Sequence, residues 1–128
     1  MDKLEIGKKG EDFAAGYFLK RGYEILERNY HSRYGEVDII AKSGKALVFV
    51  EVKTRKENSL VSPAQSVTPQ KQRKLMLTAL NYLQKSNEEF EPRFDVFEVW
   101  QNDGRIFKFN HIENAFEFSD FSGRYDIF

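Results

Sequence analysis

A short apolar run that ends in two charged residues constrains the fold of this chain more than any other feature. The run covers residues 46–50 and is apolar at both odd and even positions. A strand of that kind is covered on both faces, which makes it central in a layered fold. Glu51 and Lys53 follow at positions i and i+2, so they share one face of the strand. Because a buried ion is costly unless it is paired or binds a metal, they are either a structural ion pair or part of a site.

The remaining sequence predicts two helices and further strands around this central strand. Thr68 is a good N-cap, and Pro69 suits the first position of a helix. We expect helices over residues 4–21 and from Pro69, strands over 23–30, 36–41, 46–54, 93–100 and 105–110, a hairpin turn at 102–104, and a short helix over 112–117. This order predicts one α/β domain, 1–128, with a mixed β-sheet and helices packed on it.

Three glycines interrupt the first predicted helix. Gly7, Gly10 and Gly16 each weaken a helix by up to about 1 kcal/mol relative to Ala. Their presence is easier to understand if another backbone packs closely against this helix.

Composition excludes several classes of protein. At 128 residues, with 41% hydrophobic residues, the chain is long and apolar enough for one folded domain. The lack of cysteine excludes a disulfide scaffold, a thiolate zinc site and a cysteine nucleophile, and it suits the reducing cytoplasm. No apolar run approaches the ~18 residues of a membrane helix, so we expect no membrane partner.

The net charge of zero conceals an asymmetry along the chain. Residues 1–85 have an excess of basic side chains, and residues 86–128 have an equal excess of acidic ones. This pattern suggests a side that faces a polyanion, although an ordinary mixed surface is also compatible with it.

Strand pairing would gather acidic residues beside the charged strand end. If Ala41 pairs with Ala46, Glu36 lies opposite Glu51, and Asp38 becomes a diagonal neighbour of Glu51 at roughly 7–8 Å. The residues 37, 39 and 41 would then share the opposite face. Like charges at this separation are destabilising unless a cation or a proton intervenes, and Mg²⁺ binds through one or two carboxylates. A salt-bridge network is the alternative, and an odd turn would reverse the face of Asp38.

Two segments resemble a known nuclease core. Gly35–Ala41 contains Gly-Glu-x-Asp, and Val48–Arg55 contains Glu-x-Lys, as in the PD-(D/E)XK nuclease superfamily. More narrowly, the chain resembles the YraN-like family of small bacterial proteins, which is related to archaeal Holliday-junction resolvases. Supporting segments are Gly10-Glu11, Gly22–Leu26 with Asn29, Val67–Pro69 with Lys71, and Arg93–Val96. The match covers about residues 5–115, and the Phe-rich tail 116–128 remains unassigned.

The resemblance implies a restriction-endonuclease-like fold and a metal site. By position, Asp38 and Glu51 would be ligands of Mg²⁺ or Mn²⁺, and Lys53 would be the catalytic lysine. Glu11 would be the helix carboxylate that reaches the metal, although dipole stabilisation in the first turns of the helix explains it equally well.

Basic and polar residues flank the predicted site. Arg55 and Lys56 follow the central strand, where a ligand cleft normally opens. Four more candidates for nucleic-acid binding stand at the start of the second helix, where phosphate is favoured: Gln70, Lys71, Arg73 and Lys74. Each alone could be a solvated side chain. His111 is interpreted as a satisfied or surface residue, and Phe94, Phe97 and Trp100 as core.

The leading hypothesis is a divalent-metal-dependent nuclease that acts on DNA, including branched or processed intermediates. A homodimer is compatible with it, since symmetric cuts need two sites. Two alternatives are a non-catalytic nucleic-acid-binding module and an interaction protein that uses its acidic, aromatic C-terminal tail.

Overall fold

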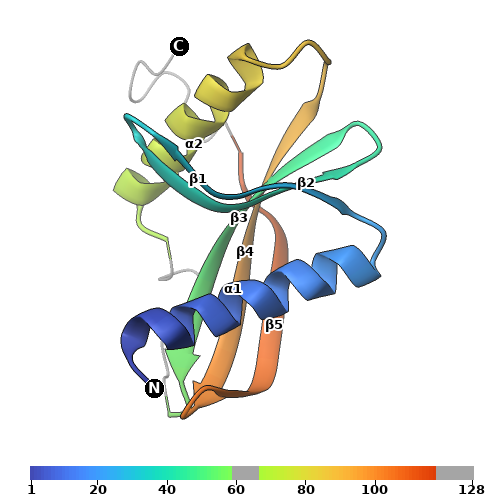
Figure 1. The fold of residues 1–128 in the computed structure, drawn as a ribbon. Helices are drawn as coiled ribbons and strands as arrows, with labels where there is room; N and C mark the ends of the chain where they lie inside the picture. Colours follow the sequence, from blue (N-terminus) through green and yellow to red (C-terminus); the bar gives the residue numbers. More distant parts are fainter. Residues whose placement is uncertain (59–66, 118–128) are drawn as a thin grey trace.

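The computed structural model describes residues 1–58 and 67–117 and has the predicted order of elements. They are α1 (Lys3–Lys20), β1 (Glu24–Ser32), β2 (Gly35–Ser43), β3 (Ala46–Lys56), α2 (Pro69–Gln84), β4 (Glu91–Asn102) and β5 (Arg105–Phe116). The strands form one sheet in the order β1-β2-β3-β4-β5, with only β3 and β4 parallel among the described neighbours. With α1 and α2 on opposite faces (Figure 1), this is the predicted restriction-endonuclease-like α/β fold.

The central position predicted for residues 46–54 is confirmed by β3. On one face, Val48 and Val50 belong to a buried cluster with Phe18 of α1. On the other face, Phe49 belongs to a second buried cluster with Met76 of α2. Both faces of the strand are therefore covered. Glu51 and Lys53 follow the covered part of β3 and belong to neither cluster.

The hairpin between β2 and β3 has a tighter turn than the sequence analysis assumed. Ser43, not Ala41, pairs with Ala46, so the predicted pairing was wrong by two residues. Glu36 consequently does not lie opposite Glu51. Side chains alternate between the two faces with a period of two. A shift of two residues therefore still lets Asp38 of β2 face the same side as Glu51.

β2 and β3 separate at the end that holds the charged residues. Their ladder stops at Ile39 and Val50, while β2 stays paired with β1 as far as Gly35. Val37 packs in the cluster beside α2, whereas Ile39 and Ala41 pack beside α1. The expectation that these three side chains share a face was wrong, and the change of face falls where the β2–β3 ladder ends.

α2 begins at the predicted residue, and α1 begins one residue before the predicted start. The Asp2 side chain accepts a hydrogen bond of 2.8 Å from the Glu5 N–H and caps α1. Thr68 Oγ1 accepts a hydrogen bond of 3.2 Å from the Lys71 N–H, and Pro69 opens α2. Neither helix in the described part of the chain is long and apolar enough to cross a membrane.

β5 continues through the segment for which a short helix was predicted. The strand extends to Phe116, whose ring stacks on Phe94 with 5.1 Å between ring centroids. The helix over 112–117 was therefore wrong. Asn114 has a left-handed φ of 54°, and the pairing of β5 with β4 is irregular near it. This irregularity breaks the strict alternation by which a strand is recognised in a sequence.

Candidate functional site

Two carboxylates meet where β2 leaves β3. The backbone N–H of Val52 donates a hydrogen bond of 2.8 Å to Asp38 Oδ2, so a side chain replaces the ladder at this point. Glu51 directly follows Val50, the last residue of β3 that pairs with β2, and is only 5% exposed. Burial, and next the charge of Glu51, raise the pKa of Asp38 to about 7. The structure thus places both predicted carboxylates in one poorly solvated, mutually repelling pair.

Two lysine side chains neutralise Glu51. Lys71 Nζ, in the first turn of α2, lies 2.5 Å from Glu51 Oε1, and Lys53 Nζ lies 3.5 Å from the same oxygen. Burial, followed by the neighbouring amine of Lys71, lowers the pKa of Lys53. Burial also opposes the charge of Lys71, but the hydrogen bond to Glu51, the charge of Glu51 and the interactions with Lys53 and Asp38 together outweigh burial and raise the pKa of Lys71. Lys53 is therefore the amine that gives up its proton more readily.

A small cavity opens beside Glu51 at the start of α2. Its volume is about 270 Å³, and it is lined by Gly35, Glu36, Glu51, Thr68, Gln70, Lys71, Lys74 and Leu75. Three of the predicted nucleic-acid-binding residues of α2 therefore share this cavity with the carboxylate, while Arg73 lies exposed elsewhere on the helix. The first turn of a helix favours phosphate, and the ammonium groups add to that preference.

Glu11 lies apart from the carboxylate pair. Its side chain hydrogen-bonds with Asn29 of β1, and it lines a separate groove of about 480 Å³ with Lys8 and Arg28. Burial raises the pKa of Glu11 in spite of the hydrogen bond from Asn29. Because the charge of Glu11 also raises the pKa of Asp38, the two carboxylates are within electrostatic reach of each other.

Two residues of the site offer the oxygen ligands that a hard divalent cation prefers. Asp38 and Glu51 offer carboxylate oxygens, which Mg²⁺ prefers and supplements with water and phosphate oxygens. Within residues 1–58 and 67–117, no group of three or more Asp, Glu or His side chains is close enough together to hold a metal ion. The ammonium group of Lys71 is the cation that Glu51 contacts in this structure. Asp38 and Glu51 therefore fit as ligands, and Glu11 as a third ligand stays a prediction.

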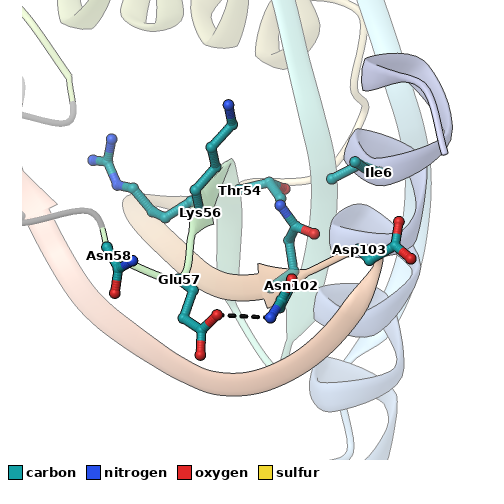
Figure 2. Close-up of a pocket in the computed structure, with 9 residues that line it drawn as sticks. Ile6, Thr54, Lys56, Glu57, Asn58, Asn102 and Asp103 are labelled. Atoms are coloured by element: carbon teal, nitrogen blue, oxygen red, sulfur yellow. Dashed lines mark hydrogen bonds between the residues drawn. The ribbon is translucent and has the colours of Figure 1, made fainter.

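A larger cavity lies at the carboxyl ends of the parallel strands β3 and β4 (Figure 2). Its volume is about 790 Å³, and Arg55 and Lys56 line it together with the amide side chains of Asn58 and Asn102. Arg55 also pairs with Glu98 at 3.3 Å, and the Glu98 side chain is completely buried. Arg55 and Lys56 thus line a cavity other than the one beside Glu51, and Arg55 has a structural role in addition.

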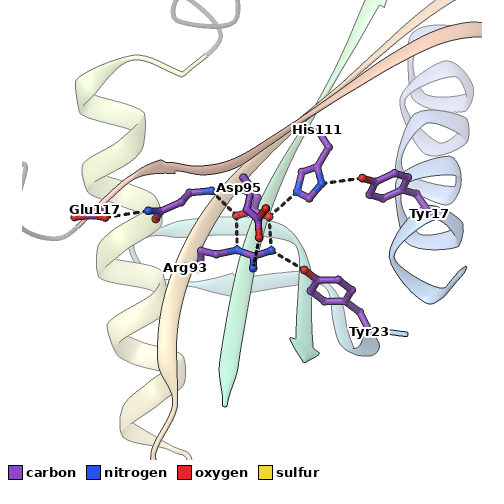
Figure 3. A network of polar contacts seen from close by, with 8 residues as sticks. Tyr17, Tyr23, Arg93, Asp95, His111 and Glu117 are labelled. Carbon is purple, nitrogen blue, oxygen red and sulfur yellow. Dashed lines mark hydrogen bonds and ion pairs between the residues drawn. The ribbon is translucent and has the colours of Figure 1, made fainter. Parts of the chain in front are cut away.

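A buried polar network fastens α1 to β4 and β5 (Figure 3). Asp95 is 1% exposed, accepts two hydrogen bonds of 2.9 and 2.8 Å from Arg93, and lies 2.6 Å from His111 Nε2. His111 Nδ1 lies 3.0 Å from the hydroxyl of Tyr17 in α1, and Arg93 donates to the hydroxyl of Tyr23 at 2.8 Å. The interpretation of His111 as a satisfied residue is confirmed, because both ring nitrogens have partners.

Sequence reasoning missed Thr78 and named Asn29 only as part of the family resemblance, without a structural role. Thr78 is fully buried in α2, and its Oγ1 lies 3.0 Å from Ser32 Oγ at the end of β1. Asn29, the partner of Glu11, has a left-handed φ of 53° inside a strand. Thr78 could have been found from its place three residues after Leu75 in the apolar stripe. Asparagine in a strand is itself a signal, since it disfavours regular strands and tolerates the left-handed region.

Comparison with known sequences assigns the chain to a family. The profile of the Uncharacterised protein family UPF0102 matches residues 10–99, a range that includes Glu11, Asp38, Glu51 and Lys53. The chain belongs to UPF0102. UPF0102 comprises the YraN-like proteins, a PD-(D/E)XK nuclease-like group, so the predicted family is confirmed.

Other members of UPF0102 match this chain over most of its length. A UPF0102 protein of Syntrophomonas wolfei is 48% identical over 114 residues, which cover 88% of this chain and 97% of the relative. A UPF0102 protein of Thermodesulfovibrio yellowstonii is 45% identical over 116 residues, which cover 91% of this chain and 99% of the relative. A UPF0102 protein of Rhodococcus opacus is 45% identical over 114 residues, which cover 88% of this chain and 97% of the relative.

Proposed function

We propose that this UPF0102 chain is a divalent-metal-dependent nuclease that cleaves DNA. The observation that supports this most is the meeting of Asp38 and Glu51 where β2 and β3 separate, with Lys53 at 3.5 Å from Glu51. Two desolvated carboxylates at such a point repel each other, which destabilises the fold unless a proton or a cation relieves the repulsion. The lack of cysteine suits a cytoplasmic location.

Each polar side chain of the site has a distinct task in the proposed reaction. Asp38 and Glu51 would hold Mg²⁺ or Mn²⁺, which supplies Lewis-acid neutralisation of charge at the phosphate. Lys53, whose pKa is lowered by burial, orients the attacking water. Lys71 stays protonated through its hydrogen bond to Glu51 and adds positive charge where the phosphate arrives.

The substrate side of the proposal rests on the start of α2. Gln70, Lys71 and Lys74 line the cavity beside Glu51, so a phosphate bound at the helix N-terminus would lie next to the carboxylates. The proposal extends to branched or processed DNA and to a two-fold dimer, because symmetric cuts need two sites.

A cleavage assay tests the proposal. Purified protein is incubated with Mg²⁺ or Mn²⁺ and with single-stranded, duplex, flap and four-way-junction DNA and a structured RNA. We expect the wild type to cut DNA, and Asp38→Ala to abolish cutting with an unchanged circular dichroism spectrum. Lys53→Met should reduce the rate by about 100-fold or more. Glu88→Ala removes an exposed carboxylate that pairs with Lys42 at 3.3 Å, and it is the matched control. Equal cutting by wild type and Asp38→Ala contradicts the proposal.

A non-catalytic nucleic-acid-binding module is the second candidate. It is favoured by the contact of Lys71 with Glu51 and by the lack of a three-donor cluster among the described residues. This candidate predicts DNA binding that weakens steeply with salt and no cleavage with any metal. The third alternative concerned the C-terminal tail, and residues 118–128 lie outside the described residues.

A further inference from the structure

The three glycines of α1 have different surroundings. A Cβ atom on Gly10 would collide with the Thr54 and Val99 side chains, so close packing explains this glycine. A Cβ on Gly7 or on Gly16 would meet no atom within 4 Å. Nothing in the packing of the described fold therefore requires glycine at position 7, where it weakens the helix by up to about 1 kcal/mol.

Gly7 lines the groove that contains Glu11. Lys3 and Glu11 lie four residues before and after it, so all three share one face of α1. Lys8 lines the same groove, and Arg28 and Asn29 line it from β1; its volume is about 480 Å³. We call this the α1 groove. Without a side chain on Gly7, a ligand can approach the helix backbone directly.

The α1 groove leads toward the carboxylate pair. In the ladder between β1 and β2, Arg28 pairs with Ile39 and Tyr30 pairs with Val37. Asn29 and Asp38 are the residues between these pairs, on neighbouring strands. The groove beside α1 and the cavity beside α2 therefore flank Asp38 from the two helices.

The charges around the α1 groove favour a polyanion. Lys3, Lys8 and Arg28 surround one carboxyl group, that of Glu11, which already accepts a hydrogen bond from Asn29. Arg28 also pairs with Asp12 at 2.7 Å. Lys3 and Lys8 are consequently the main positive charges that the groove offers to a phosphate. Phosphate contacts of this kind position a nucleic acid without reading its sequence.

We propose that the α1 groove binds the sugar–phosphate backbone of DNA on the side of Asp38 that faces α1. The inference rests on the proposed function, and it adds that bound DNA contacts both helices, with the carboxylate pair between them. Gly7 permits the close approach of the backbone, and Lys3 and Lys8 contact the phosphates.

The test compares two glycines of the same helix. Gly7→Gln places a neutral side chain in the α1 groove without changing its charge. Gly16→Gln is the matched control: nine residues later it lies on the opposite face of α1, and it too has open space. Binding of a fluorescein-labelled DNA duplex is measured by anisotropy in EDTA, which prevents cleavage, and folding is checked by thermal denaturation. We expect Gly7→Gln to weaken binding by about tenfold or more and Gly16→Gln to stay within about twofold.

A second pair of variants tests the charge. Lys3→Ser with Lys8→Ser should reduce the slope of log K against log salt by about one for each phosphate that the variant no longer binds. Lys45→Ser, in the turn between β2 and β3, should leave the slope unchanged. If the wild type binds DNA and both glycine variants bind it as tightly as the wild type does, the groove proposal is overturned while the proposed function stands. If wild type binds no DNA and cuts none, both are overturned.

Discussion

At the scale of single residues, the described site combines groups that work against the stability of the fold. Asp38 and Glu51 are poorly solvated and close enough for one to raise the pKa of the other. A fold selected for stability alone would not place two carboxylates in this position, since like charges and burial both disfavour ionisation. Replacing Asp38 with a neutral side chain that still accepts the Val52 N–H should therefore stabilise the protein while it removes activity.

The first prediction concerns Asp38→Asn in metal-free buffer. The pKa of Asp38 is about 7 in the folded chain, above its ordinary value of 3.8. Its ionisation therefore destabilises the fold increasingly as pH rises through this window. At pH 8 with EDTA, Asn can still accept the Val52 N–H and should raise the free energy of unfolding by about 1 to 3 kcal/mol. Urea denaturation measures this. A lower midpoint than wild type would show that the ionised carboxylate is a structural partner instead.

The second prediction concerns the pH dependence due to Asp95. Burial opposes its charge, but hydrogen bonds from His111 and Arg93 outweigh burial and hold the pKa below its ordinary value of 3.8. The stabilisation is therefore fully present above about pH 4 and is lost as pH falls through the lower, folded-state pKa. Asp95→Asn should lose about 3 kcal/mol at pH 7. It should also show a weaker dependence on pH below 4 than wild type, measured by urea denaturation at several pH values. Parallel pH profiles would contradict this.

At the scale of elements, the order of helices and strands follows from periodicity and caps, but register and irregularity do not. Thr68-Pro69 marks the start of α2 by local chemistry alone. The pairing of Ser43 with Ala46 depends on the preferred turn. The extension of β5 to Phe116 depends on its partner β4, which supplies pairing that no local pattern reveals.

The site shows the same division. Alternation along β3 predicts that Glu51 and Lys53 share a face, and in the structure Lys53 Nζ lies 3.5 Å from Glu51 Oε1. The contact of Lys71 with Glu51 depends on how α2 packs on the sheet, which is a tertiary property. The separation of Arg55 into another cavity likewise follows from its pairing with Glu98 of β4.

The third prediction concerns how α1 packs on the sheet. Gly10→Ala places a methyl group against Thr54 Oγ1 and Val99 Cγ2, which should lower the free energy of unfolding by about 1 to 3 kcal/mol. Gly16→Ala meets no atom within 4 Å and should raise it by up to about 1 kcal/mol through helix propensity. Chemical denaturation of the two variants side by side checks both signs, and equal effects would contradict the packing described.

At the scale of the whole molecule, the basic and acidic parts of the sequence are neighbours. β3 belongs to the basic part and pairs in parallel with β4 of the acidic part along its whole length. Two acidic residues of β4, Asp95 and Glu98, are buried in ion pairs with Arg93 and Arg55. Part of the acidic excess is therefore internal, where it holds the sheet together.

The fourth prediction is that unfolding is a single cooperative transition. The parallel pairing of β3 with β4 joins the two parts of the sequence in the centre of the sheet. Trp100 is 8% exposed and pairs with Arg55 across this junction. Its fluorescence should therefore change together with the far-ultraviolet circular dichroism, as two-state unfolding of a small domain requires. Two separated midpoints in urea would contradict this.

The turn between β2 and β3 also limits how homologous chains can change in length. Two residues, Gly44 and Lys45, join the strands between Ser43 and Ala46. One inserted residue would exchange the faces of every following position relative to β2, and it would carry the Glu51 side chain away from Asp38 unless a bulge absorbed it. Insertions and deletions in this turn should therefore occur in even numbers among chains that keep both carboxylates.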